Sequence, residues 1–209
     1  MGECFGLYLV LTEPRAGYER CTEAAVEHGI RYVQLRMKNR PPPEVLAMAR
    51  RMRAICVGSH TRLIVNDDVL VAAEADVDGV HLGQSDMPIE QARRLWPVPG
   101  KVFGLSTHNE EQAMQATRTA PNYIGVGPVW PTPAKQAPDP VLGVARVGAI
   151  VRASPLTAVA IGAIDESRLL ALLAAGVANF AVVRAVCQAP DPFDAVARLQ
   201  AIWQEHQQS

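Results

Sequence analysis

Short apolar runs recur along the chain, and each is followed by a stretch in which apolar residues repeat with helical spacing. The runs are four or five residues long and rich in Val, Ile, Leu or Tyr, which is typical of strands buried on both faces. The predicted strands are 7–11, 32–35, 63–65, 79–82, 102–105, 123–126, 158–161 and 180–183. The predicted helices are 18–28, 43–56, 69–75, 89–95, 110–119, 144–153, 166–175 and 192–204.

Local signals support several of these helix boundaries. Gly29, Gly58 and Gly176 follow predicted helices at or near their ends, where glycine stops a helix. Asn109 and Asp165 precede two others and are suited to cap them. The alternation of strand and helix is therefore supported by more than hydrophobic spacing.

Eight strands alternating with eight helices predict an α/β protein, a single closed (β/α)₈ TIM barrel of the phosphate-binding type over residues 1–209. The alternative is a doubly wound open sheet, which would usually show a glycine-rich turn after the first strand. Residues 12–15 contain no glycine. The segment 128–142 carries five prolines and is predicted to be a long loop after strand six rather than a domain boundary.

Composition narrows the class of protein. About half of the residues (49%) are apolar, and the net charge of −1 comes with Lys and Arg spread along the chain, so no nucleic-acid-binding face is expected. The apolar run 7–11 is too short for a signal core or a membrane span. We expect a cytoplasmic protein with free, buried thiols and no zinc site, because the cysteines are widely and irregularly spaced. They are Cys4, Cys21, Cys56 and Cys187.

Polar residues lie at or after the ends of five consecutive predicted strands. They are Gln34, Arg36 and Lys38 (second strand), Asn66 and Asp67 (third), Asp86 (fourth), Ser106 (fifth), and Thr132 and Lys135 (sixth). The alternation of Gln34, Arg36 and Lys38 predicts one shared face. Singly, each polar residue fits a solvated loop or a helix cap. Together they indicate a site at the carboxyl rim of a barrel, and cations with two carboxylates suit a diphosphate with Mg²⁺.

The ends of the last two predicted strands give a different signal. Gly162 and Ala163 follow strand seven, and Val183 and Arg184 close strand eight. Small residues let backbone N–H groups approach an anion, and the loops after strands seven and eight are the common phosphate site of this fold. Gly162 equally fits the alternative, tight packing of helix against sheet.

Five segments together carry a resemblance to a known family: 33–38, 64–67, 78–86, 104–108 and 123–132. In their order and spacing the chain resembles thiamine phosphate synthases along almost its whole length. The resemblance implies a Mg²⁺-dependent transferase. It would join 4-amino-2-methyl-5-(diphosphooxymethyl)pyrimidine to 4-methyl-5-(2-phosphoethyl)thiazole, or the carboxylated precursor of that thiazole, and release pyrophosphate. A homo-oligomer is possible within such a family.

The resemblance also implies roles for individual residues. The pyrimidine diphosphate would be held by Gln34, Arg36, Lys38, Asn66, Ser106 and Lys135, of which Arg36, Lys38, Ser106 and Lys135 would be catalytic. Mg²⁺ would be bound by Asp67 and Asp86. The thiazole phosphate would be held by Thr132, the position of Ala134, and backbone groups at Ala163, Val183 and Arg184.

The chain departs from the family pattern at three positions. Ala134 stands where a second Thr or Ser is usual, so one hydroxyl donor to the thiazole phosphate is missing. Ala163 replaces the second residue of a Gly-Gly pair, which requires it to keep a negative φ. Arg184 stands where many members have Ser, and we hypothesise that its guanidinium compensates for Ala134. In the alternative, Arg184 pairs with an acidic residue such as Asp165 or Asp191.

Two other functions compete with this interpretation. A thiazole tautomerase, a related barrel, binds the thiazole phosphate without coupling it, but carries a His after strand six where this chain has Pro128. His108 lies nearby, on the loop after strand five, where we expect it to open a helix. A non-catalytic sensor of thiamine intermediates would explain Ala134 and Ala163, but has no need of the carboxylates and cations.

Overall fold

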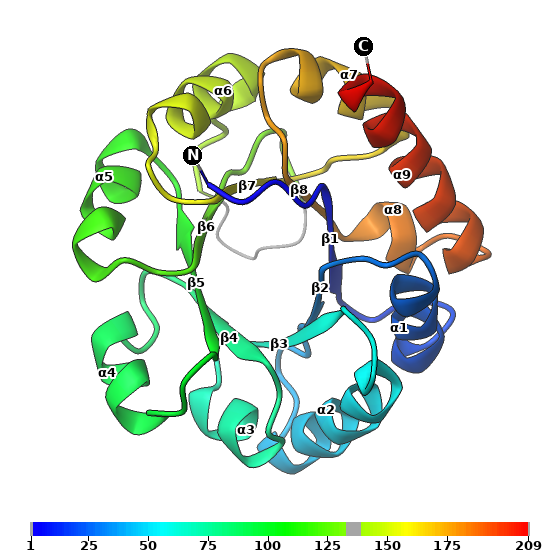
Figure 1. The fold of residues 1–209 in the computed structure, drawn as a ribbon, viewed down its shortest axis with the longest axis vertical. Helices are drawn as coiled ribbons and strands as arrows, with labels where there is room; N and C mark the ends of the chain where they lie inside the picture. Colours follow the sequence, from blue (N-terminus) through cyan, green and yellow to red (C-terminus); the bar gives the residue numbers. More distant parts are fainter. Residues whose placement is uncertain (1, 133–138, 209) are drawn as a thin grey trace.

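The computed structural model describes residues 2–132 and 139–208 and forms a closed parallel barrel, with its strands in sequence order (Figure 1). The strands are β1 (Leu7–Leu11), β2 (Tyr32–Leu35), β3 (Arg62–Asn66), β4 (Gly79–Leu82), β5 (Val102–Thr107), β6 (Tyr123–Val126), β7 (Ala158–Ile161) and β8 (Phe180–Val182). The helices are α1 (Tyr18–Glu27), α2 (Pro42–Cys56), α3 (Val69–Glu74), α4 (Ile89–Leu95), α5 (Glu110–Thr119), α6 (Gly143–Ala153), α7 (Glu166–Ala174), α8 (Arg184–Cys187) and α9 (Pro192–Gln207). The predicted barrel is confirmed, and the open sheet is excluded because β1 pairs with β8.

All predicted strands and helices are present, with most boundaries shifted by no more than two residues. The prediction was wrong at the end of strand eight: β8 stops at Val182, and Arg184 opens the short helix α8. The two predicted caps are confirmed, since Asn109 accepts a hydrogen bond from Gln112 N and Asp165 from Arg168 N. The described residues between β6 and α6 form no strand or helix, as expected of the proline-rich loop.

Apolar side chains fill two compartments. The larger one lies between the strands and the surrounding helices, and the smaller one fills the inside of the barrel. Three tyrosines occupy this interior, because β-strand alternation turns Tyr8, Tyr32 and Tyr123 inward. Their ring centroids lie 5.5 to 5.8 Å apart. The interior is therefore packed, but it carries hydroxyl groups that need partners.

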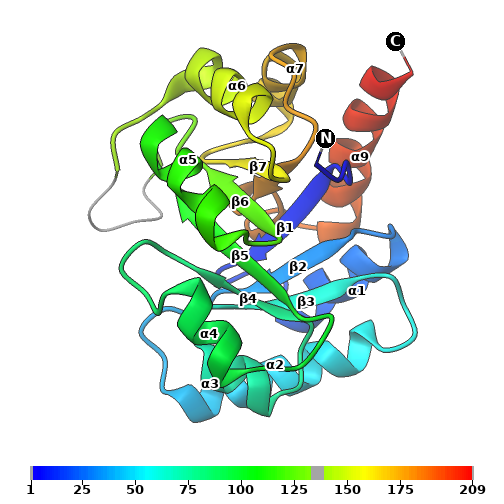
Figure 2. The ribbon, with the colours of Figure 1, turned by 60° about the vertical axis from the view of Figure 1, so that its left-hand side comes forward.

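The amino-terminal end of the barrel is closed by the beginning of the chain. Asn179 Oδ1 accepts hydrogen bonds from the backbone of Phe5 and Gly6, at 2.7 and 3.1 Å. Trp203, near the end of α9, donates to Ala178 O at 3.0 Å and packs so closely on Gly6 that a Cβ there would lie 2.7 Å from the ring. Both ends of the chain consequently lie at this end of the barrel (Figure 2).

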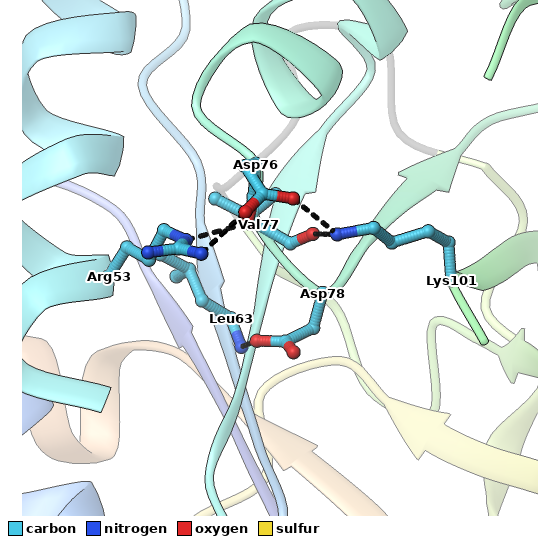
Figure 3. A network of polar contacts seen from close by, with 6 residues as sticks. All are labelled: Arg53, Leu63, Asp76, Val77, Asp78 and Lys101. Carbon is cyan, nitrogen blue, oxygen red and sulfur yellow. Dashed lines mark hydrogen bonds and ion pairs between the residues drawn. The ribbon is translucent and has the colours of Figure 1, made fainter. Parts of the chain in front are cut away.

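A polar network fastens the same end of the barrel (Figure 3). Asp76, which follows α3, accepts hydrogen bonds from Arg53 of α2 at 2.5 Å and from Lys101, just before β5, at 2.9 Å. Asp78 accepts from the backbone of Leu63 in β3 at 2.8 Å. These contacts tie α2, α3 and three strands together, on the side away from the predicted site.

Two expectations from composition can be compared with the structure. Cys21, Cys56 and Cys187 are free and buried, as predicted, but Cys4 is exposed because the segment before β1 runs along the surface. Among the helices of the described ranges, none combines the length and apolar character needed to cross a membrane.

Candidate active site

A cavity of about 530 Å³ opens at the carboxyl ends of the strands. Most of the predicted site residues line it, from six different strands or the segments that follow them. They are Gln34, Arg36, Asn66, Ser106, Thr132, Ala163, Val183 and Arg184. Ala134 and Lys135 lie outside the described residues. The structure thus gathers most of the described residues expected to bind either substrate around one space.

Three predicted residues lie beside this cavity and are not part of its wall. Lys38 forms an ion pair with Asp67 and lines a neighbouring hollow of about 270 Å³. The expectation that it shares a face with Gln34 and Arg36 was wrong, because β2 ends at Leu35 and Lys38 lies in a turn, where strand alternation no longer holds.

Two carboxylates meet beside the cavity, where Asp67 follows the wall residue Asn66. Asp86 Oδ2 accepts a hydrogen bond from Gly83 N at 2.6 Å, and the Asp86 carboxyl group lies within hydrogen-bonding reach of Asp67. Burial and the neighbouring Asp86 carboxylate raise the pKa of Asp67, while Lys38 opposes the shift. Burial also lowers the pKa of Arg36, the cation on the adjacent wall. This side of the cavity therefore carries hard oxygen donors next to positive charge.

A chain of side-chain hydrogen bonds crosses the barrel below the cavity. Gln34 Nε2 donates to the Tyr8 hydroxyl at 2.9 Å, and the hydroxyls of Tyr8 and Tyr123 lie 2.8 Å apart. His81 Nδ1 lies 3.0 Å from the Tyr123 hydroxyl, and His81 Nε2 lies 2.9 Å from Ser106 Oγ. The chain links residues of β2, β1, β6, β4 and β5.

One arrangement of hydrogens satisfies every member of this chain. Burial lowers the pKa of His81 to about 4, so its ring is neutral at physiological pH and has one donor and one acceptor nitrogen. Burial also raises the pKa of Tyr8 and of Tyr123, so both hydroxyls keep their protons. If each group donates to the next, starting at Gln34, His81 Nε2 donates to Ser106. The Ser106 O–H then remains available to a ligand.

Sequence reasoning missed several residues of the cavity wall. Tyr8, His81 and Tyr123 line the cavity, but they lie within predicted strands, where hydrophobic spacing alone indicates residues of a buried sheet. Their polar atoms were the available signal, because a His or Tyr inside a barrel strand needs a buried partner. His108 also lines the wall: its Nδ1 lies 2.8 Å from Gly127 O, and α5 begins only after Asn109.

The opposite wall of the cavity presents backbone N–H groups. Within the described residues, the amides of Gly162, Ala163 and Ile164 have no backbone acceptor. The expectation of a negative φ at Ala163 was wrong: φ is +50° there and +122° at Gly162. The left-handed conformation is possible for Ala at a cost of about 1–2 kcal/mol. All three residues of this turn line the cavity.

Arg184 also belongs to this wall. Its Nε donates to Gln188 Oε1 at 3.2 Å, and Gln188 directly follows α8. Neither Asp165 nor Asp191 forms an ion pair with Arg184. Asp165 Oδ2 instead lies 3.9 Å from Arg168 Nη1, and Asp191 Oδ2 lies 3.8 Å from Arg20 Nη2. No ion pair joins Arg184 to another residue of the described ranges.

Comparisons with known proteins agree with this geometry. The chain is 36% identical over 189 residues to the thiamine-phosphate synthase of Methanospirillum hungatei, a match that covers 89% of this chain and 91% of that protein. It is 42% identical over 186 residues to that of Gloeobacter violaceus, covering 89% of this chain and 54% of the relative, so this chain spans about half the length of that protein.

A solved structure is also similar to this chain along almost its whole length. The thiamine phosphate pyrophosphorylase of Pyrococcus furiosus superposes with a TM-score of 0.87 at 32% identity, covering 97% of this chain and 96% of that one. The sequence profile described as thiamine monophosphate synthase matches residues 7–186, from β1 into α8. The matched residues include every strand of the barrel and the described cavity wall as far as Ala185. This chain therefore belongs to the thiamine monophosphate synthase family.

Proposed function

We propose that this chain condenses the pyrimidine diphosphate with the thiazole phosphate to form thiamine phosphate and pyrophosphate. One observation supports the proposal: a single cavity has two separate regions whose groups suit anions. Arg36 lies on the wall near the carboxylates Asp67 and Asp86. On the other wall lie Gly162 and Ala163, whose amides have no backbone acceptor among the described residues. Two anionic substrates held in these regions would meet above the hydrogen-bonded chain.

The pyrimidine would lie on the floor of the cavity. Gln34 and Ser106 are held there by the hydrogen-bonded chain, and with His81 Nε2 as the donor the Ser106 O–H would be free to donate to the substrate. Arg36 and Asn66, also in the wall, would hold the diphosphate, together with Lys135. Because Gln34 and Ser106 are oriented before the substrate arrives, they would bind it without reorganising.

The two carboxylates fit a magnesium ion. Asp67 and Asp86 lie close together, and Mg²⁺ binds through one or two carboxylates plus phosphate oxygens. When bound, the ion would neutralise charge on the departing pyrophosphate. Lys38 is paired with Asp67, so it would hold that carboxylate in place and add positive charge beside the cavity.

The remaining chemistry requires alignment rather than a base. In a dissociative substitution, pyrophosphate would leave the pyrimidine methylene carbon first, and the thiazole ring nitrogen, which has no proton to lose, would then attack the resulting cation. A neutral His81 below the site is consistent with this, since it holds Ser106 and does not need to change protonation. Thr132 and the amides after β7 would fix the thiazole phosphate so that its ring nitrogen faces the carbon.

The decisive experiment mixes both substrates with Mg²⁺ and follows thiamine phosphate and pyrophosphate. Asp67→Asn and Asp86→Asn should each lower the rate by orders of magnitude and reduce its dependence on Mg²⁺. Asp194→Asn, which changes an exposed carboxylate on α9, is the matched control and should behave as the parent protein. Absence of pyrophosphate release would refute the proposed reaction, and unchanged Mg²⁺ dependence in both site variants would refute the metal assignment.

A further inference from the structure

A second arginine, Arg168, reaches the anion-binding wall of the cavity from the first turn of α7. Its Nη1 donates to the carbonyl oxygen of Ala163 at 2.7 Å. Its guanidinium lies 5.4 Å from the ring centroid of Trp130, just before Thr132 in the loop after β6. One side chain thus touches both segments expected to hold the thiazole phosphate.

The contact with Ala163 acts on an unfavourable backbone. Ala163 has a φ of +50°, a region that alanine rarely adopts. The hydrogen bond from Arg168 holds its carbonyl oxygen, and therefore helps to fix the orientation of the amides of the turn, Gly162, Ala163 and Ile164. Arg168 can thereby set the direction of donors that it does not itself supply.

The guanidinium also keeps donors of its own. Asp165 Oδ2 lies 3.9 Å from Arg168 Nη1, too far for a strong hydrogen bond, and the Asp165 carboxylate already accepts from Ser167 Oγ at 2.7 Å. In the described part of the chain, no side-chain or backbone acceptor binds Arg168 Nε or Nη2. A planar guanidinium in this position can form paired hydrogen bonds to phosphate oxygens.

We propose that Arg168 binds the phosphate of the thiazole substrate and also positions the Gly162–Ala163 turn against it. The inference rests on the proposed function for the identity of the ligand. The cation over Trp130 supplies a charged donor that Thr132 and the backbone amides lack. Arg168 belongs to α7 and Arg184 to α8, so the two arginines would approach the phosphate from different helices.

The test compares Arg168→Gln and Arg168→Lys with Arg152→Gln. Arg152 Nη1 likewise donates to a backbone carbonyl oxygen, that of Ala175 at 2.5 Å, but Arg152 lies outside the cavity. Calorimetry measures binding of the thiazole phosphate and of the corresponding thiazole alcohol, which lacks the phosphate. Arg168→Gln should weaken thiazole phosphate binding about ten- to a hundredfold, as expected for a lost charged hydrogen bond, and leave the alcohol unchanged.

Arg168→Lys should recover part of the affinity, because it keeps the charge and loses the paired geometry. Arg152→Gln should bind both ligands as the parent protein does. Equal weakening of phosphate and alcohol in Arg168→Gln, or no weakening of either, would overturn the proposal. If the parent protein binds the thiazole phosphate and forms no thiamine phosphate, the proposed reaction fails, while the role of Arg168 is still decided by the binding data.

Discussion

Replacing Tyr8 with Phe tests the hydrogen-bonded chain below the cavity by removing a single oxygen atom. The ring keeps its packing against Tyr32 and Tyr123, with centroids at 5.5 and 5.6 Å. The Gln34 amide loses its acceptor at 2.9 Å, and the Tyr123 hydroxyl loses one of its partners, at 2.8 Å, while it keeps His81 Nδ1 at 3.0 Å. Gln34 is only 3% exposed, so water cannot readily replace the lost contact.

The expected cost follows from these two contacts. A buried polar group left without a partner costs about 1–3 kcal/mol, and removing the buried hydroxyl itself returns part of that loss. We therefore expect Tyr8→Phe to lower the free energy of unfolding by about 1–3 kcal/mol. For a chain of this length each kcal/mol corresponds to about 2 to 4 °C in the melting temperature.

Urea unfolding followed by tryptophan fluorescence measures this change. Tyr18→Phe is the matched control, because the Tyr18 hydroxyl accepts from Glu13 N at 3.0 Å in a half-exposed position that water can reach. Tyr8→Phe should also raise the KM for the pyrimidine diphosphate, since Gln34 is no longer held in place. If both variants lose the same small free energy and keep the same KM, the chain does not act as described.

Three further outcomes are expected. When the pH falls from about 7.5 to 5, the free energy of unfolding of the parent protein should decrease by about 2 kcal/mol more than that of His81→Gln. Burial lowers the pKa of His81 from 6.5 to about 4, so the unfolded state takes up the proton first. Urea unfolding measures this difference, and a steeper decrease in the variant would contradict it. Arg184→Ser should raise the thiazole phosphate KM about ten- to a hundredfold and spare the pyrimidine diphosphate, and an unchanged KM would remove the side chain from the site. Lys101→Met should cost about 1–2 kcal/mol, through lost bonds to Val77 O and Asp76 at 2.6 and 2.9 Å, without changing either KM in steady-state assays.

The barrel was predictable because its signal is repeated. Each strand is a short apolar run and each helix shows an apolar stripe, so small errors at one boundary did not affect the others. Helix α8 was missed because four residues cannot show helical periodicity. Its first residue, Arg184, was consequently assigned to the end of a strand.

The site was predictable where polar residues follow strands and less so inside them. Asn66 and Ser106 belong to the last residues of β3 and β5, where a barrel places its ligand groups. His81 and Tyr123 depend on contacts between distant strands, which hydrophobic spacing does not report. The φ of Ala163 was mispredicted for a related reason, because tertiary contacts such as the bond from Arg168 outweigh local preference.

The position of the chain ends has a practical consequence. Trp203 of α9 packs on Gly6 at the amino-terminal end of the barrel, whereas the cavity opens at the other end. A protein joined to either end, or a surface to which one end is attached, would therefore sit behind the barrel and leave the mouth accessible.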